Sequence, residues 1–388
     1  MNLILNSLAV KQLFHRPKRA AAAITGIAFS NILVLFQWGL LNALYKSQSE
    51  PYSHLNGELV ILSRSYSNKS NPEFISKQAA QRAFANQNIK SISFLNFTIV
   101  DALNPYNKLK RKALLYAIDP DTPAFNPSSI ALNTSNIQPF GKVVFNRESV
   151  PEFTKPLLEE LNKRTILNLE INKKSVQLNG TFAINITFNS NVGLLTSRTA
   201  YNQIANDSNP NKIQLAVLKL ADRTLIEETK RDVKNIYLNN PLIQILSIKE
   251  LQILETNYHK NNTTFGFIFG MGMLVGLAVS AIILYQILYS DVSEHCPEYA
   301  TLKAIGYPNA FIVSIIIQEA GLMVSIAFLP SIAISLLIYQ ALAVQTKLLF
   351  DLTAFQIVAI FFSSWIISTS SGWIAADKVR RLDPADSF

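Results

Sequence analysis

Long apolar runs alternate with polar segments along this chain, and four runs are long enough to cross a lipid bilayer. A membrane-spanning helix needs about 20 mostly apolar residues. The runs that approach or exceed this length are Ala20–Leu44, Phe265–Tyr289, Phe311–Tyr339 and Ala354–Ala375. We therefore predict four transmembrane helices, within residues 20–45, 262–290, 311–340 and 354–376. Pro330 in the third run predicts a kink or tilt there.

A long polar segment, residues 46–261, separates the first two runs and mixes strand-like with helix-like stretches. Stretches rich in β-branched and aromatic residues predict strands at Glu58–Leu62, Ile92–Val100, Lys112–Ile118, Val143–Phe145, Val176–Phe188, Ile213–Leu220 and Ile243–Leu246. Apolar residues at helical spacing predict helices at Glu73–Asn86, Glu152–Asn162, Ser197–Asn206 and Asp222–Tyr237. The Pro-rich stretch Asp119–Pro127 predicts a junction between lobes. We expect an α+β domain of two lobes, one from residues 46–118 and 210–250, the other from the inserted residues 119–209.

A helix is predicted at the downstream end of this segment. Ser247–His259 has Leu251, Ile253 and Leu254 on its apolar side, and Ser247 with Glu250 forms the pattern of a capping box. The helix leads toward the second apolar run. We expect the two to form one continuous rod.

The polar interruption at residues 291–310 contains one short helix, Pro297–Ile305. Pro297 suits a first helical turn and Glu298 complements the positive end of the helix dipole. Gly306 can adopt the left-handed conformation that ends a helix, and Pro308 prevents its continuation. A helix of about nine residues is marginal alone in water, which favours a cytoplasmic partner. The alternative is a well-capped surface loop.

Basic residues beside the apolar runs predict the orientation in the membrane. They precede the first run at Lys11, Arg16, Lys18 and Arg19, and follow the last at Lys378, Arg380 and Arg381. By the positive-inside rule both termini are cytoplasmic. Residues 291–310 and the tail 377–388 are then cytoplasmic, and residues 46–261 lie outside. Residues 1–19 predict an amphipathic helix on the inner membrane face, with a disordered tail as the alternative.

Small residues recur along the second run. Gly266 and Gly270 form one G-x-x-x-G pair, and Gly272, Gly276 and Ser280 form a second small-residue face. Small residues let two helices approach closely in lipid. We expect the second face to pack against another helix, with a self-contact in a dimer as one possibility.

Catalytic and cofactor motifs are absent from the sequence. The four histidines match no metal-ligand spacing, and no G-x-S-x-G, H-E-x-x-H or Walker A motif occurs. No basic cluster interleaved with aromatic residues lies on a cytoplasmic segment, so nucleic acid is not an expected partner. The single cysteine, Cys296, leaves the outer segment without disulfides. These features argue against an enzyme and against a metal or cofactor site.

One acidic residue, Glu319, lies deep in the third run beside Gln318. Intramembrane acids are functional candidates by default. One carboxyl without an intramembrane base makes a poor proton relay, so a structural role is favoured. We expect Glu319 to be neutral, or hydrogen-bonded to a Ser or Gln on a neighbouring helix.

Three segments of this sequence resemble the permeases of the MacB/FtsX (type VII) superfamily of ABC transporters, and most closely the DevC-like permeases. The segments are Leu8–Leu44, Glu298–Tyr307 and Arg381–Phe388. The middle one matches the superfamily pattern E-x-x-x-x-K-A-[IL]-G through Glu298, Lys303, Ala304, Ile305 and Gly306. The order of one span, a large outer domain and three more spans is also similar.

The resemblance implies a homodimer that binds two copies of a separate cytoplasmic ATPase, which supplies the ATP and Mg site that this chain lacks. Residues 291–310 would be the coupling helix. The residues assigned to ATPase coupling are Glu298, Tyr299, Leu302, Lys303, Ile305 and Gly306. The resemblance further implies a bacterial inner-membrane protein with a periplasmic domain, a periplasmic adaptor (membrane-fusion) protein, a TolC-like outer-membrane channel and a lipid-like cargo such as a glycolipid.

We therefore expect an α-helical membrane protein with four transmembrane helices and a large α+β domain of two lobes inserted between helices 1 and 2. Its expected function is that of the mechanotransmitting permease of a tripartite ABC efflux pump. The alternative is an FtsX-like signalling scaffold that activates a periplasmic hydrolase without transport. An intramembrane enzyme is disfavoured, because no catalytic constellation is present.

Overall fold

The computed structural model describes residues 17–377, apart from residues 70, 72, 138–140, 164–166 and 206–208. The chain divides into two compact units. The first, here the helical bundle, contains residues up to 42, 264–341 and from 350 onward. The second, here the large domain, contains residues 43–263 and 342–349. Most of the predicted amphipathic helix, residues 1–16, and nearly all of the tail lie outside the described residues, so both stay predictions.

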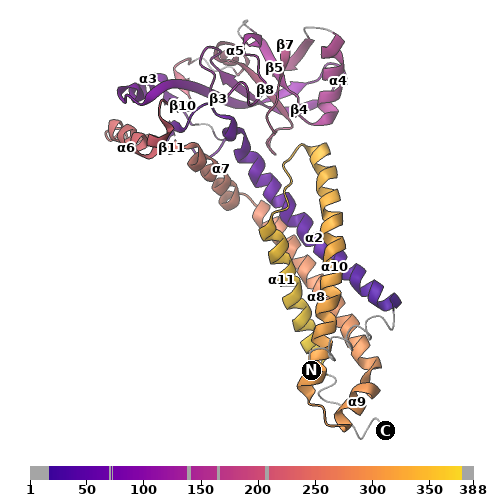
Figure 1. Cartoon of the computed structure of the whole chain (residues 1–388). Coiled ribbons are helices and arrows are strands. Elements are labelled where there is room, and N and C mark those ends of the chain that lie inside the picture. Colours follow the sequence, from indigo (N-terminus) through magenta and orange to yellow (C-terminus); the bar gives the residue numbers. More distant parts are fainter. Residues whose placement is uncertain are drawn as a thin grey trace. The chain divides into compact units, whose positions relative to one another are not determined.

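Four long apolar helices run through the bundle: α2 (Pro17–Ser49), α8 (Phe265–Glu294), α10 (Asn309–Thr346) and α11 (Ala354–Ala375) (Figure 1). Each is long and apolar enough to cross a membrane, which confirms that the four predicted runs form apolar helices of spanning length. The helices α2 and α10 extend beyond their apolar runs at both ends. Pro330 lies within α10, which continues through it. A fifth helix, α9 (Cys296–Ala304), follows α8 and precedes α10.

Small and hydroxyl-bearing residues bring the bundle helices close together. A Cβ added at Gly276 of α8 would lie 2.8 Å from Val34 of α2. Ser331 Oγ and Tyr339 Oη of α10 donate to carbonyl oxygens of α2, at Ala28 and Leu35. Because lipid offers no hydrophobic drive for helix association, such close contacts and interhelical hydrogen bonds hold the bundle together.

The large domain contains a nine-stranded sheet in the order β11-β1-β10-β3-β4-β8-β5-β7-β6. In chain order its strands are β1 (Leu59–Ser63), β3 (Ile89–Leu103), β4 (Lys110–Ile118), β5 (Lys142–Asn146), β6 (Leu167–Ile171), β7 (Lys174–Phe182), β8 (Val192–Ser197), β10 (Leu215–Leu220) and β11 (Ile243–Ser247). A short second sheet pairs β2 (Ile75–Ser76) with β9 (Lys212–Ile213). The helices of the domain are α3 (Lys77–Gln81), α4 (Pro151–Lys163), α5 (Arg198–Ile204), α6 (Ile226–Ile236) and α7 (Ile248–Asn262). Four short 3₁₀ helices complete it: η1 (Glu50–His54), η2 (Arg82–Ala85), η3 (Thr134–Asn136) and η4 (Arg223–Leu225).

The sheet crosses the predicted border between lobes. Strand β4 of the first predicted lobe pairs in parallel with β8 of the second, from Ala113 with Val192 to Ile118 with Ser197. The far end of β3 also pairs with β6, at Ala102 with Ile171. This pairing closes the ring β3-β4-β8-β5-β7-β6. One sheet thus runs through both sequence segments, and the division into two lobes stays a prediction.

Two predicted strands are shorter or more divided in the structure than in the sequence analysis. Residues Ile213–Leu220 split at Gln214, whose side chain accepts from Phe97 N and donates to Phe97 O. Strand β7 ends at Phe182 instead of Phe188, because the side chain of Asn146 bonds the backbone N–H and C=O of Ile184. In both places an amide side chain forms the two hydrogen bonds that a neighbouring strand would otherwise form. The pattern of apolar residues does not reveal such strand ends. The strands β6 and β8 were not predicted.

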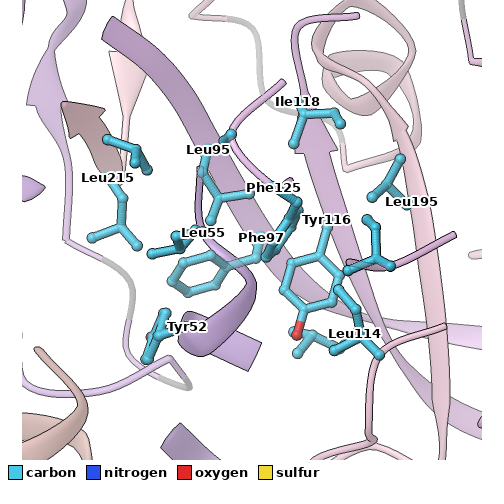
Figure 2. Packing of buried hydrophobic residues seen from close by; sticks show 14 of the residues in the cluster. Tyr52, Leu55, Leu95, Phe97, Leu114, Tyr116, Ile118, Phe125, Leu195 and Leu215 are labelled. Carbon is cyan, nitrogen blue, oxygen red and sulfur yellow. The ribbon is translucent and has the colours of Figure 1, made fainter. Parts of the chain in front are cut away.

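The central core of the large domain packs one face of the sheet against the segments that join the domain to the spans. Figure 2 shows Phe97, Tyr116 and Phe125 gathered beside Leu55, with Tyr116 and Phe125 edge to face at 5.2 Å between centroids. Tyr52 of η1 and Leu251 of α7 belong to the same core. The two segments that connect the large domain to the spans, η1 after α2 and α7 before α8, are therefore anchored in the domain core.

The predicted continuous rod of α7 and the second span is interrupted, which corrects that expectation. Helix α7 ends at Asn262, and Thr263 has the extended backbone φ −117°, ψ 152°. Thr263 Oγ1 donates to His259 O, and α8 begins at Phe265. At the other end of α7, Ser247 and Glu250 form the predicted capping box, which is confirmed.

Candidate functional site

The predicted coupling helix is α9, Cys296–Ala304, one residue earlier at each end than the prediction. His295 is the C-terminal cap of α8 and also the N-terminal cap of α9. The two helices therefore meet at a single residue. Pro297 stands in the first turn, as the sequence indicated.

The end of α9 is a Schellman motif. Gly306 has φ +101°, its N–H donates to Lys303 O, and Tyr307 N–H donates to Leu302 O. This pair of hydrogen bonds satisfies carbonyl groups at the helix end. A side chain at position 306 would meet no neighbour, so the left-handed backbone is the reason for glycine there.

The six predicted coupling residues differ in burial, because they lie on different faces of α9. Tyr299 is fully buried and Leu302 packs against the same bundle core. Glu298 and Ile305 are exposed, with Ile305 at 70%. Lys303 is half-buried in the last turn and Gly306 is the exposed residue that ends the helix. The buried pair fixes α9 to the bundle, whereas the exposed residues are available to a partner.

A line of ionisable side chains leads from α9 into the bundle. His295 Nδ1 lies 3.1 Å from Glu298 Oε2, and His295 Nε2 lies 3.7 Å from Asp291 Oδ1. Asp291 of α8 in turn lies close to Glu319 of α10. The line thus joins α9, α8 and α10.

Glu319 has an ionisable neighbour, Asp291, that the sequence did not indicate. The expectation that Glu319 is neutral, or hydrogen-bonded to a Ser or Gln, stays a prediction, and its buried Oε2 has no hydrogen-bond partner among the described residues. Asp291 was assigned to the loop because the apolar run ends at Tyr289, whereas α8 continues to Glu294. Gln318, the neighbouring predicted site residue, has a buried side-chain oxygen without a hydrogen-bond partner among the described residues.

The predicted small-residue face of α8 lies against α2 of the same chain. A Cβ at Gly272 would meet the side chain of Gln37, and one at Gly276 would meet Val34. Ser280 is buried, with 2% of its surface exposed. Gly270 of the other pair has open space around it. A contact of the Gly272, Gly276 and Ser280 face in a dimer stays a prediction.

A second polar cluster, here the Glu255 cluster, lies in the large domain. The carboxylate of Glu255 on α7 accepts hydrogen bonds from Tyr52 Oη, Tyr66 Oη and Lys69 N, each at 3.2 Å. Lys69 Nζ donates to Gln48 O. Burial lowers the pKa of Lys69 to about 8, although Glu255 and Glu50 oppose this. Burial and the nearby Glu255 raise the pKa of Tyr66 well above its usual value.

The Glu255 cluster ties together three segments that are distant in sequence. Gln48 belongs to the end of α2, Lys69 to the loop after β1, and Glu255 to α7. No sequence pattern indicates this cluster, because Glu255 lies more than 180 residues after Tyr66 and Lys69.

Comparison with known proteins gives one family match. Residues 270–384 match the FtsX-like permease C-terminal family. This region contains most of α8, all of α9, α10 and α11, and every predicted site residue. No curated protein sequence matches the chain closely enough to count as a relative.

Several solved structures show a distant likeness to part of the chain, among them the following two. The extracellular domain of the noncanonic ABC-type transporter YknZ from Gram-positive bacteria is 10% identical, with a TM-score of 0.34, covering 49% of this chain and 98% of its own. The periplasmic region of MacB from Actinobacillus actinomycetemcomitans is 12% identical, with a TM-score of 0.36, covering 55% of this chain and 98% of its own. Residues 270–384 thus resemble the C-terminal part of an FtsX-like permease, and the described residues contain four helices long and apolar enough to cross a membrane.

Proposed function

We propose that this chain is the permease subunit of a tripartite ABC efflux pump, which works as a homodimer and is driven by a separate cytoplasmic ATPase. The orientation proposed has both termini and α9 in the cytoplasm of a bacterium with two membranes. An adaptor protein and a TolC-like channel would complete the pump on the side of the large domain. The proposed cargo is a lipid-like molecule such as a glycolipid.

The observation that carries this proposal is the attachment of α9. A helix of nine residues would be marginal alone, yet Tyr299 seats it in the bundle core. His295 contacts Glu298 of α9 and Asp291 of α8, and Asp291 lies close to Glu319 of α10, so α9 is connected to both neighbouring spans. A partner that moves the exposed face of α9 would therefore also move the two spans on either side of it.

A hollow in the large domain supports an amphiphilic cargo. It measures about 570 Å³ and lies beside the end of α10, where Leu348 meets Val150, Ile186 and Phe188. Arg111 and Glu152, paired at 3.0 Å, stand on its wall. A largely apolar hollow with a few charged groups is typical of small-molecule sites. Gln345 and Thr346, which line the hollow, are the last residues of α10, so a lipid-like molecule would arrive beside them.

The direct test uses the exposed residues of α9. Replacing Glu298 and Ile305 by Ala should release the ATPase, because both side chains face outward. The matched control is Ile366→Ala, since Ile366 of α11 is similarly exposed at 63% but lies on a span. The measurement is copurification of the ATPase and stimulation of its turnover by the full-length permease.

The outcomes separate the proposal from its rivals. Loss of copurification in Glu298→Ala with Ile305→Ala, but not in Ile366→Ala, supports coupling through α9. Equal copurification in both would overturn it. Export of a labelled glycolipid from reconstituted vesicles supports the pump. ATPase coupling without export, combined with activation of a wall hydrolase, would favour the signalling scaffold.

A further inference from the structure

A second hollow in the large domain is lined by the two segments that connect the domain, along the sequence, to the spans before and after it. It measures about 750 Å³, and the end of α2 with η1 forms one wall. The other wall is one face of α7, which supplies Lys249, Gln252, Ile253, Thr256, Asn257 and Lys260. Gln252 Nε2 donates to Ser49 O across the gap at 3.5 Å. The two walls are therefore bridged.

The charge of this hollow is positive. Lys46, Lys249 and Lys260 line it, and Glu50 is the one acid among its lining residues. The Glu50 carboxylate already accepts from His54 Nε2 at 2.9 Å and Asn185 Nδ2 at 3.1 Å. In the part of the chain that the structure describes, neither Lys249 nor Lys260 has a carboxylate within ion-pair distance. Lys260 Nζ instead stands 5.9 Å from the ring centroid of Tyr45.

Connectivity places two of these lysines at the surface of the bilayer. Lys46 is the second residue after the apolar run that ends at Leu44, and Lys260 precedes Phe265 by five residues. At a rise of about 1.5 Å per helical residue, Lys46 lies about 3 Å beyond Leu44 along α2. Four residues, which include the end of α7 at Asn262, separate Lys260 from the start of α8. Lysines and tyrosines at this level meet lipid headgroups. Ile253, 56% exposed, adds an apolar contact in the same hollow.

We propose that this hollow binds the phosphate-bearing headgroup of an anionic membrane lipid. Lys46 and Lys260 would contact the phosphate, and the amide and hydroxyl groups of Asn257, Gln252 and Ser53 would bond the rest of the headgroup. A soluble phosphate compound offers the same anion, but the proximity of Tyr45 and of the two spans favours a lipid. The inference does not rest on the proposed export activity or on the orientation of the chain, because headgroups lie at both membrane surfaces.

The test uses the full-length protein in phosphatidylcholine nanodiscs that contain a photoreactive phosphatidylglycerol as a minor component. Labelling of the α7 peptide, residues 248–260, is measured by mass spectrometry, with photoreactive phosphatidylcholine as the zwitterionic comparison. The variant is Lys46→Gln with Lys260→Gln. The matched control is Lys90→Gln with Lys234→Gln, two exposed lysines elsewhere in the large domain.

Phosphatidylglycerol should label the peptide more than phosphatidylcholine, and the double variant should lose this preference. A lysine near a membrane surface contributes about a fivefold preference for anionic lipid, so two should contribute about 30-fold at low ionic strength. The control pair should keep the preference. Lys46→Arg with Lys260→Arg keeps both charges and should also keep it, which guards against a folding defect in the Gln variant.

Three results would overturn the inference. Equal labelling by the two lipids would show that the hollow does not select negative charge. Preference retained in Lys46→Gln with Lys260→Gln, or lost in the Arg variant, would show that these two charges do not provide it. Soluble glycerol phosphate that suppresses labelling as well as unlabelled phosphatidylglycerol does would assign the hollow to a free phosphate compound. Because no ATPase is present, none of these results depends on coupling through α9.

Discussion

The two buried acidic centres of this protein are built in opposite ways. In the Glu255 cluster, one carboxylate accepts from three donors on two segments and lies within reach of a buried ammonium. In the bundle, the side chains of Glu319, Asp291, His295 and Glu298 form a line in which His295 contacts Asp291 and Glu298, and Asp291 lies close to Glu319. The first arrangement holds its charge in place from several sides. The second links three helices through one contact at a time.

This difference indicates that the Glu255 cluster is fixed, whereas the line of side chains at α9 can rearrange. Removing a buried carboxylate from several hydrogen bonds leaves every donor without an acceptor, which lowers stability by several kcal/mol. A single-file contact can be exchanged with water or with a partner at lower cost, particularly at Glu298, whose side chain is 64% exposed. We expect the Glu255 cluster to act as a rigid joint and the α9 end to respond to a partner.

The largest effect should follow removal of the central carboxylate. Glu255→Ala leaves two tyrosine hydroxyls without their acceptor and removes the counter-charge of Lys69. Loss of one member of a buried charged group typically destabilises by about 3–5 kcal/mol. The measurement is denaturant unfolding of the purified full chain, followed by tyrosine and tryptophan fluorescence. Glu228→Ala on α6, outside any cluster, is the control and should change little. A shift no greater than that of Glu228→Ala would contradict the rigid joint.

The pH dependence of the same cluster gives the second prediction. The pKa of Lys69 falls from 10.5 to about 8 on folding. Above pH 8 the unfolded chain therefore binds more protons than the folded one, and stability rises with pH until the unfolded pKa is reached. Below pH 8 the buried charge destabilises the fold to a constant extent. The pKa of Tyr66 is raised, so its own effect lowers stability only above about pH 10.

Between pH 8 and pH 10 the parent should gain about 2–3 kcal/mol relative to Lys69→Met, which has no ammonium to lose. The comparison is the difference in free energy of unfolding between the two proteins at each pH. A difference that stays constant across this interval would show that Lys69 is not held as a buried cation.

The bundle provides a third prediction, on the contact that fixes α8 to α2. Gly276→Leu adds a side chain where a Cβ would already lie 2.8 Å from Val34. Overpacking of this kind destabilises by about 1–3 kcal/mol. Gly270→Leu makes the same change on the same helix where a Cβ meets nothing, so it should be neutral within the monomer. Thermal stability in detergent separates the two.

The same pair of variants also tests the dimer. Crosslinking between cysteines placed in α8, in a background without Cys296, reports the distance between two copies. If Gly270→Leu disrupts crosslinking while Gly276→Leu disrupts only monomer stability, the exposed face carries the self-contact. If Gly276→Leu disrupts crosslinking and Gly270→Leu does not, the self-contact lies on the face of Gly272, Gly276 and Ser280.

The smallest effect is expected at Glu319. Gln keeps the shape of Glu and most of its hydrogen-bonding capacity, so Glu319→Gln should leave ATP-dependent export unchanged. Glu319→Leu removes that capacity at a buried position and should lower the yield of folded protein. Export from reconstituted vesicles with ATP, with and without a proton gradient, is the measurement. Loss of export in Glu319→Gln, together with gradient dependence in the parent, would identify a proton-coupled mechanism instead.

Sequence patterns predicted the spans and the caps well, because each depends on a few neighbouring residues. The four apolar runs, the capping box of Ser247 and Glu250, and the helix ending at Gly306 are all local. Strand ends were less predictable, since Gln214 and Asn146 stop strands through bonds to distant backbone. The alternation of apolar and polar residues in Leu167–Ile171 could have revealed β6. Strand β8 was harder to predict, because Gly193 is disfavoured in strands.

The candidate site was only half predictable for the same reason. The motif around Glu298 and Gly306 marked α9, but nothing in it distinguished the buried Tyr299 from the exposed Ile305. The partnership of Glu319 with Asp291 joins two helices across a turn and has no sequence signal. The Glu255 cluster depends on side chains from both ends of the large domain, which meet only after the sheet has formed.

The strand order of the sheet has a consequence for how the protein is made. Strand β1 lies between β10 and β11, so its neighbours leave the ribosome long after it does. Leu215 follows Ser63 by 152 residues, which takes about 8–30 s at roughly 5–20 residues per second. Throughout that interval the five residues LVILS, all buried in the finished domain, have no partner strand. During synthesis the nascent chain therefore carries an unpaired apolar strand, which is an aggregation hazard until β10 and β11 have been made.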